Sequence, residues 1–203
     1  MSDFSETRRS TFWTNIYENE TPRWDLGSPS PVLEAAVGLG VFERGGRILV
    51  PGCGNGHDAI LLAQSGFRVT AVDFSEVPVR SLSERVHQLG LEMEVRQANI
   101  FDLSSEDAGA FDGVFEYTCY CAIDPAQRDD YRDLMSHLVR PGGALLMFAY
   151  PLDKQAPGPP HGIFLDELRA RFDAAWHWRL DCESPLVPEH RRGAERVVLL
   201  SRR

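Results

Sequence analysis

The stretch Arg47-Ile-Leu-Val-Pro-Gly-Cys-Gly-Asn-Gly-His-Asp58 decides the fold of this chain. Residues 48–50 form a short apolar run that is typical of a buried parallel strand, and residues 58–63 have the pattern of a helix. The glycines between them alternate as G-x-G-x-G. A strand, a tight glycine turn and a helix open a nucleotide-binding βαβ unit, in which glycine permits a positive φ and lets the ligand approach the backbone.

An acidic residue follows at the distance that a ribose-binding carboxylate requires. The next apolar run, residues 69–72, ends in Asp73, which is 21 residues after Gly52 and is placed to accept both ribose hydroxyls. A dinucleotide-binding turn is G-x-G-x-x-G, and here its third glycine is replaced by His57. The alternating pattern instead resembles the first motif of class I S-adenosylmethionine-dependent methyltransferases. A nicotinamide dehydrogenase is the less favoured alternative.

The composition indicates one globular domain without a nucleic-acid or membrane partner. With 203 residues, 43% hydrophobic and 25% charged, the chain suits a single domain spanning residues 1–203. We expect residues 1–40 to form an N-terminal lid with helices and residues 45–203 to form a Rossmann-like core. The net charge of −9 disfavours a polyanionic partner, and no apolar run is long enough for a signal peptide or a membrane span.

Arginines near the C-terminus are an exception to the acidic composition. We interpret them as the solvated face of a terminal hairpin: Arg191, Arg192, Arg196, Arg202 and Arg203.

Cysteine and histidine spacings predict no metal site. Cys53, Cys119, Cys121 and Cys182 make no C-x-x-C pair, and the six histidines show no H-x-x-x-H spacing. Reduced thiols of this kind are typical of a cytoplasmic protein. We therefore expect a cytoplasmic protein without a metal, and we expect it to be a monomer.

Strand and helix patterns alternate through the rest of the chain. Strands are expected at residues 91–97, 111–116 and 144–150, and helices at residues 76–88, 124–139 and 164–172. Residues 151–160 contain too many prolines for regular structure, and residues 176–180 and 196–200 are expected to pair as a closing hairpin. The prediction is an α/β fold: a doubly wound, mostly parallel seven-stranded sheet with an antiparallel terminal hairpin.

The N-terminal aromatic residues have two interpretations. Phe12, Trp13, Ile16 and Tyr17 lie on one face of a helix expected within residues 5–20, and Trp24 follows in a Pro- and Gly-rich stretch. A second helix is expected to begin at Ser30-Pro31. The aromatic rings either strap the N-terminus onto the core or form a lid over the ligand. A cation gains roughly 0.5–2 kcal/mol on an aromatic face, and S-adenosylmethionine carries its charge on the reacting sulfur.

Further candidates follow the later strands, because ligands of open α/β sheets bind at the carboxyl ends of the strands. Asn99 beside Ile100 is placed to bracket an adenine ring, and the loop at residues 151–160 is placed to form a pocket wall. Tyr117 and Tyr120 are expected to point toward the reaction centre, with a loop packing cluster as the alternative. His161 follows the proline-rich loop, and a surface histidine without a role is its simpler interpretation.

With these residues assembled, the sequence resembles the thiopurine S-methyltransferase family, most closely its halide/thiol methyltransferase branch. The motifs that carry the resemblance run in order through nearly the whole chain: Trp13 with Tyr17, Thr21-Pro-Arg-Trp-Asp-Leu-Gly27 and Pro31, Leu49-Val-Pro-Gly-Cys-Gly-Asn-Gly-His-Asp58, Val72-Asp-Phe-Ser75, Ile100-Phe-Asp102, Phe111-Asp112, Glu116-Tyr-Thr-Cys-Tyr-Cys-Ala-Ile123, Arg140-Pro-Gly-Gly143, Tyr150-Pro151 and Gly158-Pro-Pro160. The tryptophan followed by W-D-x-G is specific to this branch.

The resemblance implies transfer of a methyl group from S-adenosyl-L-methionine to a small soft nucleophile, usually sulfur and possibly a halide or thiocyanate, with S-adenosyl-L-homocysteine as the product. It implies cofactor contacts at Trp13, Tyr17, Trp24, Gly52, Gly54, Asp73, Asn99, Ile100 and Tyr117. Two positions depart from the family pattern. Tyr17 stands where a tryptophan is usual, and Cys119-Tyr120 stands where the branch has two phenylalanines, which disfavours halide as the natural acceptor.

Methyl transfer to a thiol needs positioning more than it needs a strong base. The reaction is an in-line displacement, and a thiol of pKa ~8.5 already supplies some thiolate at neutral pH. Tyr117, Tyr120, Tyr150 and His161 are the candidates to orient the acceptor or to take its proton. The alternatives are O- or N-methylation of a small molecule, which would require a base, and a cofactor-binding protein without catalysis. Nucleic-acid N-methylation is disfavoured because no N-P-P-Y-type motif follows the fourth strand.

Overall fold

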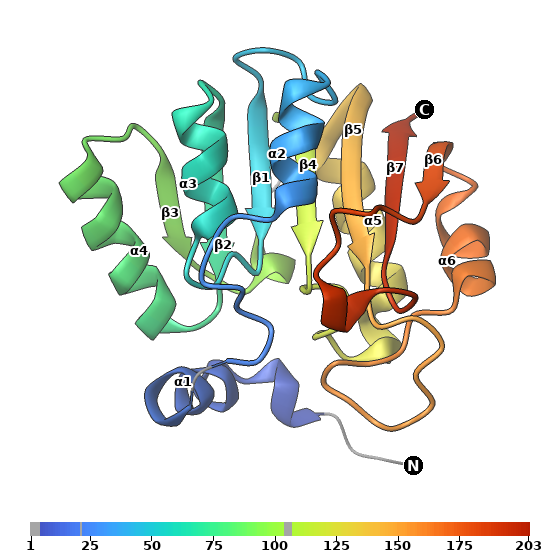
Figure 1. Cartoon of the computed structure of the whole chain (residues 1–203), viewed down its shortest axis with the longest axis horizontal. Coiled ribbons are helices and arrows are strands. Elements are labelled where there is room, and N and C mark those ends of the chain that lie inside the picture. The colour runs from blue at the N-terminus through green and yellow to red at the C-terminus, as the bar shows by residue number, and fades with distance from the viewer. Residues whose placement is uncertain (1–4, 21, 104–106) are drawn as a thin grey trace.

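The computed structural model describes residues 5–20, 22–103 and 107–203 (Figure 1). Thr21, which begins one of the quoted motifs, and residues 1–4 of the expected lid lie outside this description. The centre of the molecule is a seven-stranded sheet with the order β3-β2-β1-β4-β5-β7-β6. Its strands are β1 (Arg47–Pro51), β2 (Arg68–Asp73), β3 (Glu94–Gln97), β4 (Phe111–Tyr117), β5 (Val139–Ala149), β6 (Trp176–Cys182) and β7 (Arg196–Arg202).

The first five strands are parallel, whereas β7 runs antiparallel to both β5 and β6. The predicted doubly wound, mostly parallel sheet with an antiparallel terminal hairpin is therefore confirmed. Parallel strands buried on both faces require continuous apolar runs, which is what Ile48, Leu49 and Val50 supply in β1.

Helices cover both faces of this sheet. The longer helices are α1 (Ser10–Asn19), α2 (Pro31–Gly38), α3 (His57–Gln64), α4 (Glu76–Leu89), α5 (Arg128–Leu138) and α6 (Leu165–Phe172), and short 3-10 turns are η1 (Ser5–Arg8), η2 (Ile100–Asp102), η4 (Pro125–Gln127) and η5 (Glu189–Arg191). One hydrophobic core packs the sheet against α2, α3 and α4, and another packs it against α5 and α6. Helix α1 lies apart from both layers, below the carboxyl ends of the parallel strands (Figure 1). Among the described helices, none combines the length and apolar composition of a membrane span.

The predicted boundary between the fifth helix and the fifth strand is wrong. The helix was expected at residues 124–139 and the strand at residues 144–150, but α5 covers Arg128–Leu138 and β5 begins at Val139, so Pro141-Gly-Gly143 lies inside the strand. Val139 pairs with Phe111 of β4, so strand pairing begins before the glycines. A Cβ on Gly143 would lie 2.9 Å from the carbonyl oxygen of Asp112, so glycine permits the close approach of the two strands.

Candidate functional site

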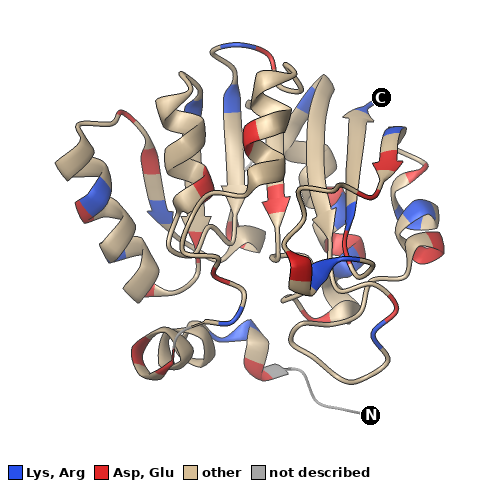
Figure 2. Ribbon diagram, in the orientation of Figure 1, with Lys and Arg blue, Asp and Glu red and all other residues tan. Residues whose placement is uncertain are grey.

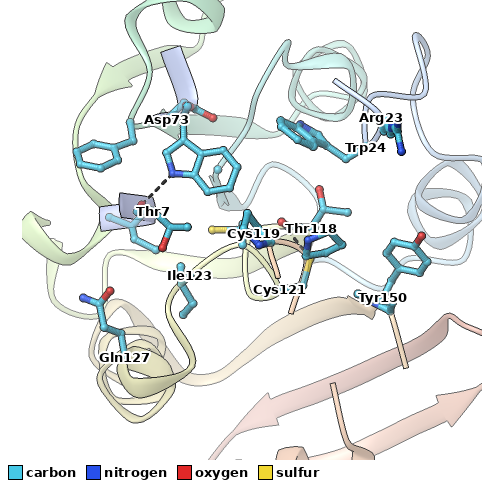
Figure 3. A pocket seen from close by; sticks show the side chains of 18 of the residues that line it. Thr7, Arg23, Trp24, Asp73, Thr118, Cys119, Cys121, Ile123, Gln127 and Tyr150 are labelled. Atoms are coloured by element: carbon cyan, nitrogen blue, oxygen red, sulfur yellow. Dashed lines mark hydrogen bonds between the residues drawn. The ribbon is translucent and has the colours of Figure 1, made fainter. Parts of the chain in front are cut away.

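A cavity of about 530 Å³ opens between the carboxyl ends of the parallel strands and the N-terminal segment; Figure 3 shows residues that line it. This volume lies within the range of small-molecule sites. The residues that line it come from the N-terminal segment, from the turns after β1 to β5 and from η5: Thr7, Arg8, Trp13, Tyr17, Arg23, Trp24, Gly52, Asp73, Phe74, Asn99, Ile100, Phe101, Thr118, Cys119, Cys121, Ala122, Ile123, Gln127, Tyr150, Pro151, Lys154, Pro159, Pro160, His190 and Arg191. The sheet edge expected to bind a ligand is thus the edge that is hollowed.

The glycine turn leaves no room for side chains. Gly52 has a φ of +58°, and a Cβ there would lie 2.9 Å from Cβ and Sγ of Cys119. Gly54 has a φ of +50°, and a Cβ there would lie 2.8 Å from the hydroxyl of Tyr17. Both the backbone conformation and the space therefore require glycine, and they bring the turn directly against α1.

Asp73 is held rigidly at the end of β2. Its carboxylate accepts hydrogen bonds from the backbone N–H groups of Gly54 (2.8 Å) and Ser75 (2.9 Å). Burial raises the pKa of Asp73, and these two hydrogen bonds oppose the rise. Each carboxylate oxygen accepts up to two hydrogen bonds, so both oxygens retain capacity for a ligand.

The next turn supplies the residues expected to bracket an adenine ring. Asn99 accepts a hydrogen bond from the backbone N–H of Phe101 through Oδ1 (3.1 Å), which fixes the start of η2. Its amide NH₂ group remains available as a donor. Asn99, Ile100 and Phe101 all line the cavity. They follow β3, which is the neighbour of the strand that ends in Asp73.

Aromatic residues of the N-terminal segment roof the cavity. The indole N–H of Trp13 donates to the carbonyl oxygen of Thr7 (2.9 Å) (Figure 3), and the rings of Trp13 and Trp24 meet edge to face at 5.7 Å. The Tyr17 ring meets Trp24 in the same way at 5.9 Å. No residue of α1 is fully buried. Its aromatic side chains are only partly buried, and two of them, Trp13 and Tyr17, line the cavity. We therefore favour a lid over a packing strap.

Asp25 ties this segment to the glycine turn, a contact that sequence reasoning missed. Its carboxylate accepts hydrogen bonds from the Gly27 backbone N–H (2.7 Å) and from the side-chain amide of Asn55, and it lies 3.2 Å from Nε2 of His57. The W-D-x-G motif therefore has a structural purpose: its aspartate joins the lid to the turn, directly beside Trp24.

We expect Asp25→Ala to weaken S-adenosylhomocysteine binding by about tenfold, because losing two or three hydrogen bonds of roughly 0.5–1.5 kcal/mol each frees the lid and the turn. Isothermal titration calorimetry measures the dissociation constant. Asp25→Asn keeps one acceptor oxygen and is expected to lose less. Wild-type affinity in the alanine variant would contradict this role.

The turn after β4 lines the cavity with its small residues and not with its tyrosines. Thr118, Cys119 and Cys121 are part of the wall. Tyr120 is 2% exposed and packs against Tyr131 (5.4 Å between ring centroids) and Phe172, as in the packing alternative. Tyr117 lines a small adjoining cavity together with Gly52.

His161 is buried, so its interpretation as a surface histidine is wrong. Its side chain is 4% exposed, and its backbone N–H donates to the carbonyl oxygen of Cys121 (2.6 Å). Burial, with a smaller contribution from Arg128, lowers the pKa of His161. It braces the proline-rich loop against the turn after β4, and the described lining of the cavity includes Pro159 and Pro160 but not His161.

Arg191 is also buried, which corrects the expectation of a solvated hairpin arginine. Its guanidinium lies over the rings of Tyr117 (4.9 Å) and Tyr150 (4.5 Å) and donates to the carbonyl oxygen of Trp24 (3.1 Å). It forms an ion pair with Glu195 at 3.5 Å. Tyr117 donates a hydrogen bond to the same carboxylate (3.3 Å), and burial together with Glu195 raises the pKa of Tyr117. The tyrosine hydroxyl is therefore protonated at neutral pH.

The thiols in the wall are protonated as well. All four cysteines are free. Burial raises the pKa of Cys119, and it raises the pKa of Cys121 to about 12. Because only the thiolate is strongly nucleophilic, neither side chain competes with an external acceptor. The described residues contain no group of histidine, cysteine and carboxylate side chains that could hold a metal.

A buried carboxyl group, that of Glu116, holds the backbone of the turn after β4. Glu116 is 1% exposed and accepts hydrogen bonds from the backbone N–H groups of Cys119 (2.8 Å) and Tyr120 (2.7 Å) through Oε1. Burial raises the pKa of Glu116 to about 7, although the two hydrogen bonds act to lower it. A group whose pKa is higher in the folded state stabilises the fold below its ordinary pKa, and that contribution is lost as the pH rises through the folded value.

We therefore expect the melting temperature of the wild-type protein to fall between pH 5 and pH 8. The melting temperature of Glu116→Gln should fall several degrees less over this range, because glutamine retains the Oε1 acceptor but does not titrate. One kcal/mol corresponds to about 2–4 °C in a chain of this size. Thermal melts across this range provide the measurement. Glu84→Gln, at an exposed position, is the control and should follow the wild type. Parallel curves for wild type and Glu116→Gln would contradict the assignment.

Comparison with known proteins gives a consistent result. A profile of the family described as Thiopurine S-methyltransferase (TPMT) matches residues 8–203. "Probable thiol methyltransferase 2" from Arabidopsis thaliana is 34% identical over 161 residues, which cover 76% of this chain and 68% of that protein. "Thiocyanate methyltransferase 1" from the same plant is 31% identical, covering 74% and 66% respectively. The chain thus spans about two thirds of the length of these plant relatives.

A bacterial relative and solved structures extend the comparison. "Thiopurine S-methyltransferase" from Pseudomonas fluorescens is 26% identical, covering 89% of this chain and 88% of that protein. The Burkholderia thailandensis 1,6-didemethyltoxoflavin-N1-methyltransferase, solved with S-adenosylhomocysteine, superposes with a TM-score of 0.76 at 20% identity, covering 100% of this chain and 91% of that chain. A SAM-dependent methyltransferase from Aquifex aeolicus superposes with a TM-score of 0.65 at 19% identity, covering 83% and 88%. These structures share the fold.

Proposed function

The chain belongs to the thiopurine S-methyltransferase family, and we propose that it transfers the methyl group of S-adenosylmethionine to the sulfur of a small thiol. It is an S-adenosylmethionine-dependent methyltransferase by this membership. One observation supports the proposal most directly. The glycine turn, the carboxylate of Asp73, the aromatic residues of the N-terminal segment and the proline-rich loop all line the same cavity.

The residues present fit S-adenosylmethionine. Gly52 offers backbone without a side chain, and Asp73 retains acceptor capacity for ribose hydroxyls. Asn99 and Ile100 supply a donor and an apolar face for adenine. Trp13 and Trp24, with Tyr17 beside them, supply aromatic faces that favour a sulfonium. We assign Gly54 and Tyr117 an indirect role in cofactor binding. The backbone N–H of Gly54 positions the Asp73 carboxylate, and the ring of Tyr117 packs against the guanidinium of Arg191.

When bound, the cofactor supplies an electrophilic methyl group on a positively charged sulfur. The chain supplies orientation and exclusion of water: the lid covers the cavity, and the proline-rich loop holds the acceptor opposite the glycine turn. The acceptor sulfur forms the new C–S bond, the electrons of the broken bond remain on the cofactor sulfur, and the thiol proton passes to water. Tyr150 and Gln127 line the acceptor side and are candidates to orient the thiol.

A thiol suits this wall better than a phenol does. The cavity lining includes several titratable side chains, and burial raises the pKa of three of them, Tyr17, Cys119 and Cys121. His190 also lines the cavity and is the side chain that O-methylation would have to use as its base. None of these three can accept a proton from an acceptor at neutral pH. A thiol of pKa ~8.5 needs no such base, whereas a hydroxyl of pKa ~10 does.

Formation of S-adenosylhomocysteine with a panel of acceptors tests the proposal. The panel contains small thiols, sulfide, thiocyanate, iodide, an aromatic thiol and a catechol. Turnover that concentrates on thiols is the expected result. Turnover on the catechol alone would replace it with O-methylation, and cofactor binding without turnover would support the non-catalytic alternative. We also propose a monomer acting in the cytoplasm, in line with its free cysteines.

A further inference from the structure

The cavity lining carries more basic than acidic side chains, although the whole chain carries a net charge of −9. Arg8, Arg23, Lys154 and Arg191 line the cavity, and Asp73 is its one carboxylate among the described lining residues. Figure 2 shows basic segments of the N-terminal part, of the loop after β5 and of the segment before β7 at the edge where the parallel strands end. A cavity of one sign attracts ligands of the other sign.

Arg8 and Arg191 each have a carboxylate partner within the protein, whereas Lys154 and Arg23 form no ion pair among the described residues. Arg8 pairs with Asp124 at 2.7 Å, and Arg191 pairs with Glu195 at 3.5 Å. Lys154 donates to the carbonyl oxygens of Pro160 (2.6 Å) and Pro157 (3.3 Å), which do not cancel its charge. Within the described part of the chain, no carboxylate forms an ion pair with Lys154 or Arg23.

Arg191 adds buried donors that the protein leaves unused. Its side chain is 1% exposed, and its Nε and Nη1 atoms have no hydrogen-bond partner among the described residues. The ion pair with Glu195, at 3.5 Å, is longer than a hydrogen bond between charged groups and leaves both donors without a hydrogen-bond partner. Buried unsatisfied donors are costly, so a guanidinium left this way in a cavity wall is suited to an anionic ligand group.

We propose that the natural acceptor is a thiol that also carries a carboxylate, and that Arg191, with Lys154 and Arg23 nearby, binds this carboxylate. The inference rests on the proposed thiol methylation. The carboxylate is unchanged by the reaction, in which only the thiol proton and the methyl group move. Its binding fixes one end of the acceptor, so that the sulfur at the other end points toward the methyl donor.

Matched acceptors test the proposal. The pair 3-mercaptopropionate and 3-mercaptopropionamide differ in charge and hardly in shape. We expect kcat/KM to be at least about tenfold higher for the carboxylate, and the difference to shrink as sodium chloride screens the charges. The comparison is conservative, because a nearby carboxylate disfavours the thiolate. Equal or better turnover of the amide would overturn the inference.

Charge-removing variants identify the residues. We expect Arg23→Gln with Lys154→Gln to lower kcat/KM about tenfold for the carboxylate and by a much smaller factor for the amide. Arg23→Lys with Lys154→Arg keeps both charges and should restore the preference. Calorimetry of 3-mercaptopropionate binding to the complex with S-adenosylhomocysteine should show the same loss of affinity.

The remaining outcomes separate two failures. If the glutamine variants weaken S-adenosylhomocysteine itself to the same extent, the cations serve the cofactor's carboxylate and the inference is overturned. If no thiol is methylated although S-adenosylhomocysteine binds, the proposed function fails and the inference fails with it. If thiols react without regard to charge, only the inference fails.

Discussion

Replacing Asp73 with alanine will weaken the binding of S-adenosylhomocysteine by about 100-fold. A hydrogen bond to a charged group contributes roughly 1.5–3 kcal/mol, and two ribose hydroxyls would lose their acceptor. Each 1.4 kcal/mol is about tenfold in affinity. The backbone N–H groups of Gly54 and Ser75 also lose their acceptor, which loosens the glycine turn.

Calorimetry with wild type, Asp73→Ala, Asp73→Asn and Glu76→Ala makes this test specific. The asparagine keeps one acceptor oxygen and should fall between wild type and alanine. Glu76 is an exposed carboxylate at the start of α4, close in sequence but outside the cavity lining, so its variant should bind normally. An unchanged dissociation constant for Asp73→Ala would refute the ribose assignment.

Removing both tryptophans of the lid, Trp13→Ala with Trp24→Ala, will lower kcat/KM by about 100-fold and will change the melting temperature by only a few degrees. Each aromatic face near a cation is worth roughly 0.5–2 kcal/mol, and an open lid also admits water. The stability loss is small because α1 buries no residue fully.

Phe12→Ala provides the matched control for the lid. Phe12 lies on the same helix and contacts Trp13 edge to face at 5.0 Å, but it is absent from the described lining of the cavity. It should lose little activity. Steady-state kinetics and thermal melts on the three proteins decide between the interpretations: a loss of stability in proportion to the loss of activity would restore the packing strap.

Local patterns predicted the βαβ unit, the order of strands and helices along the chain and the position of Asp73. These features depend on spacing along a short stretch, since a buried parallel strand must be apolar throughout and the turn after it must tolerate a positive φ. The proline-rich loop was likewise identified as a pocket wall, because it follows a strand whose carboxyl end had to lie at the ligand edge.

Burial of individual polar residues depended on distant contacts. Arg191 has the sequence context of a solvated arginine, yet it is enclosed by Tyr117, Tyr150 and Trp24 from other parts of the chain. His161 is enclosed in the same way beneath the turn after β4. Nothing within a few residues of either position indicates these neighbours, so local pattern could not predict them.

The sequence by itself therefore determined the sheet, the glycine turn and the position of Asp73 at the end of β2, because each follows from short-range spacing and backbone conformation. The tertiary structure alone decided which residues of the turn after β4 face the cavity, that Asp25 joins the N-terminal segment to the glycine turn, and that four cations line the same cavity. These features arise from segments more than twenty residues apart, and their side chains meet only after the sheet and its helices have packed.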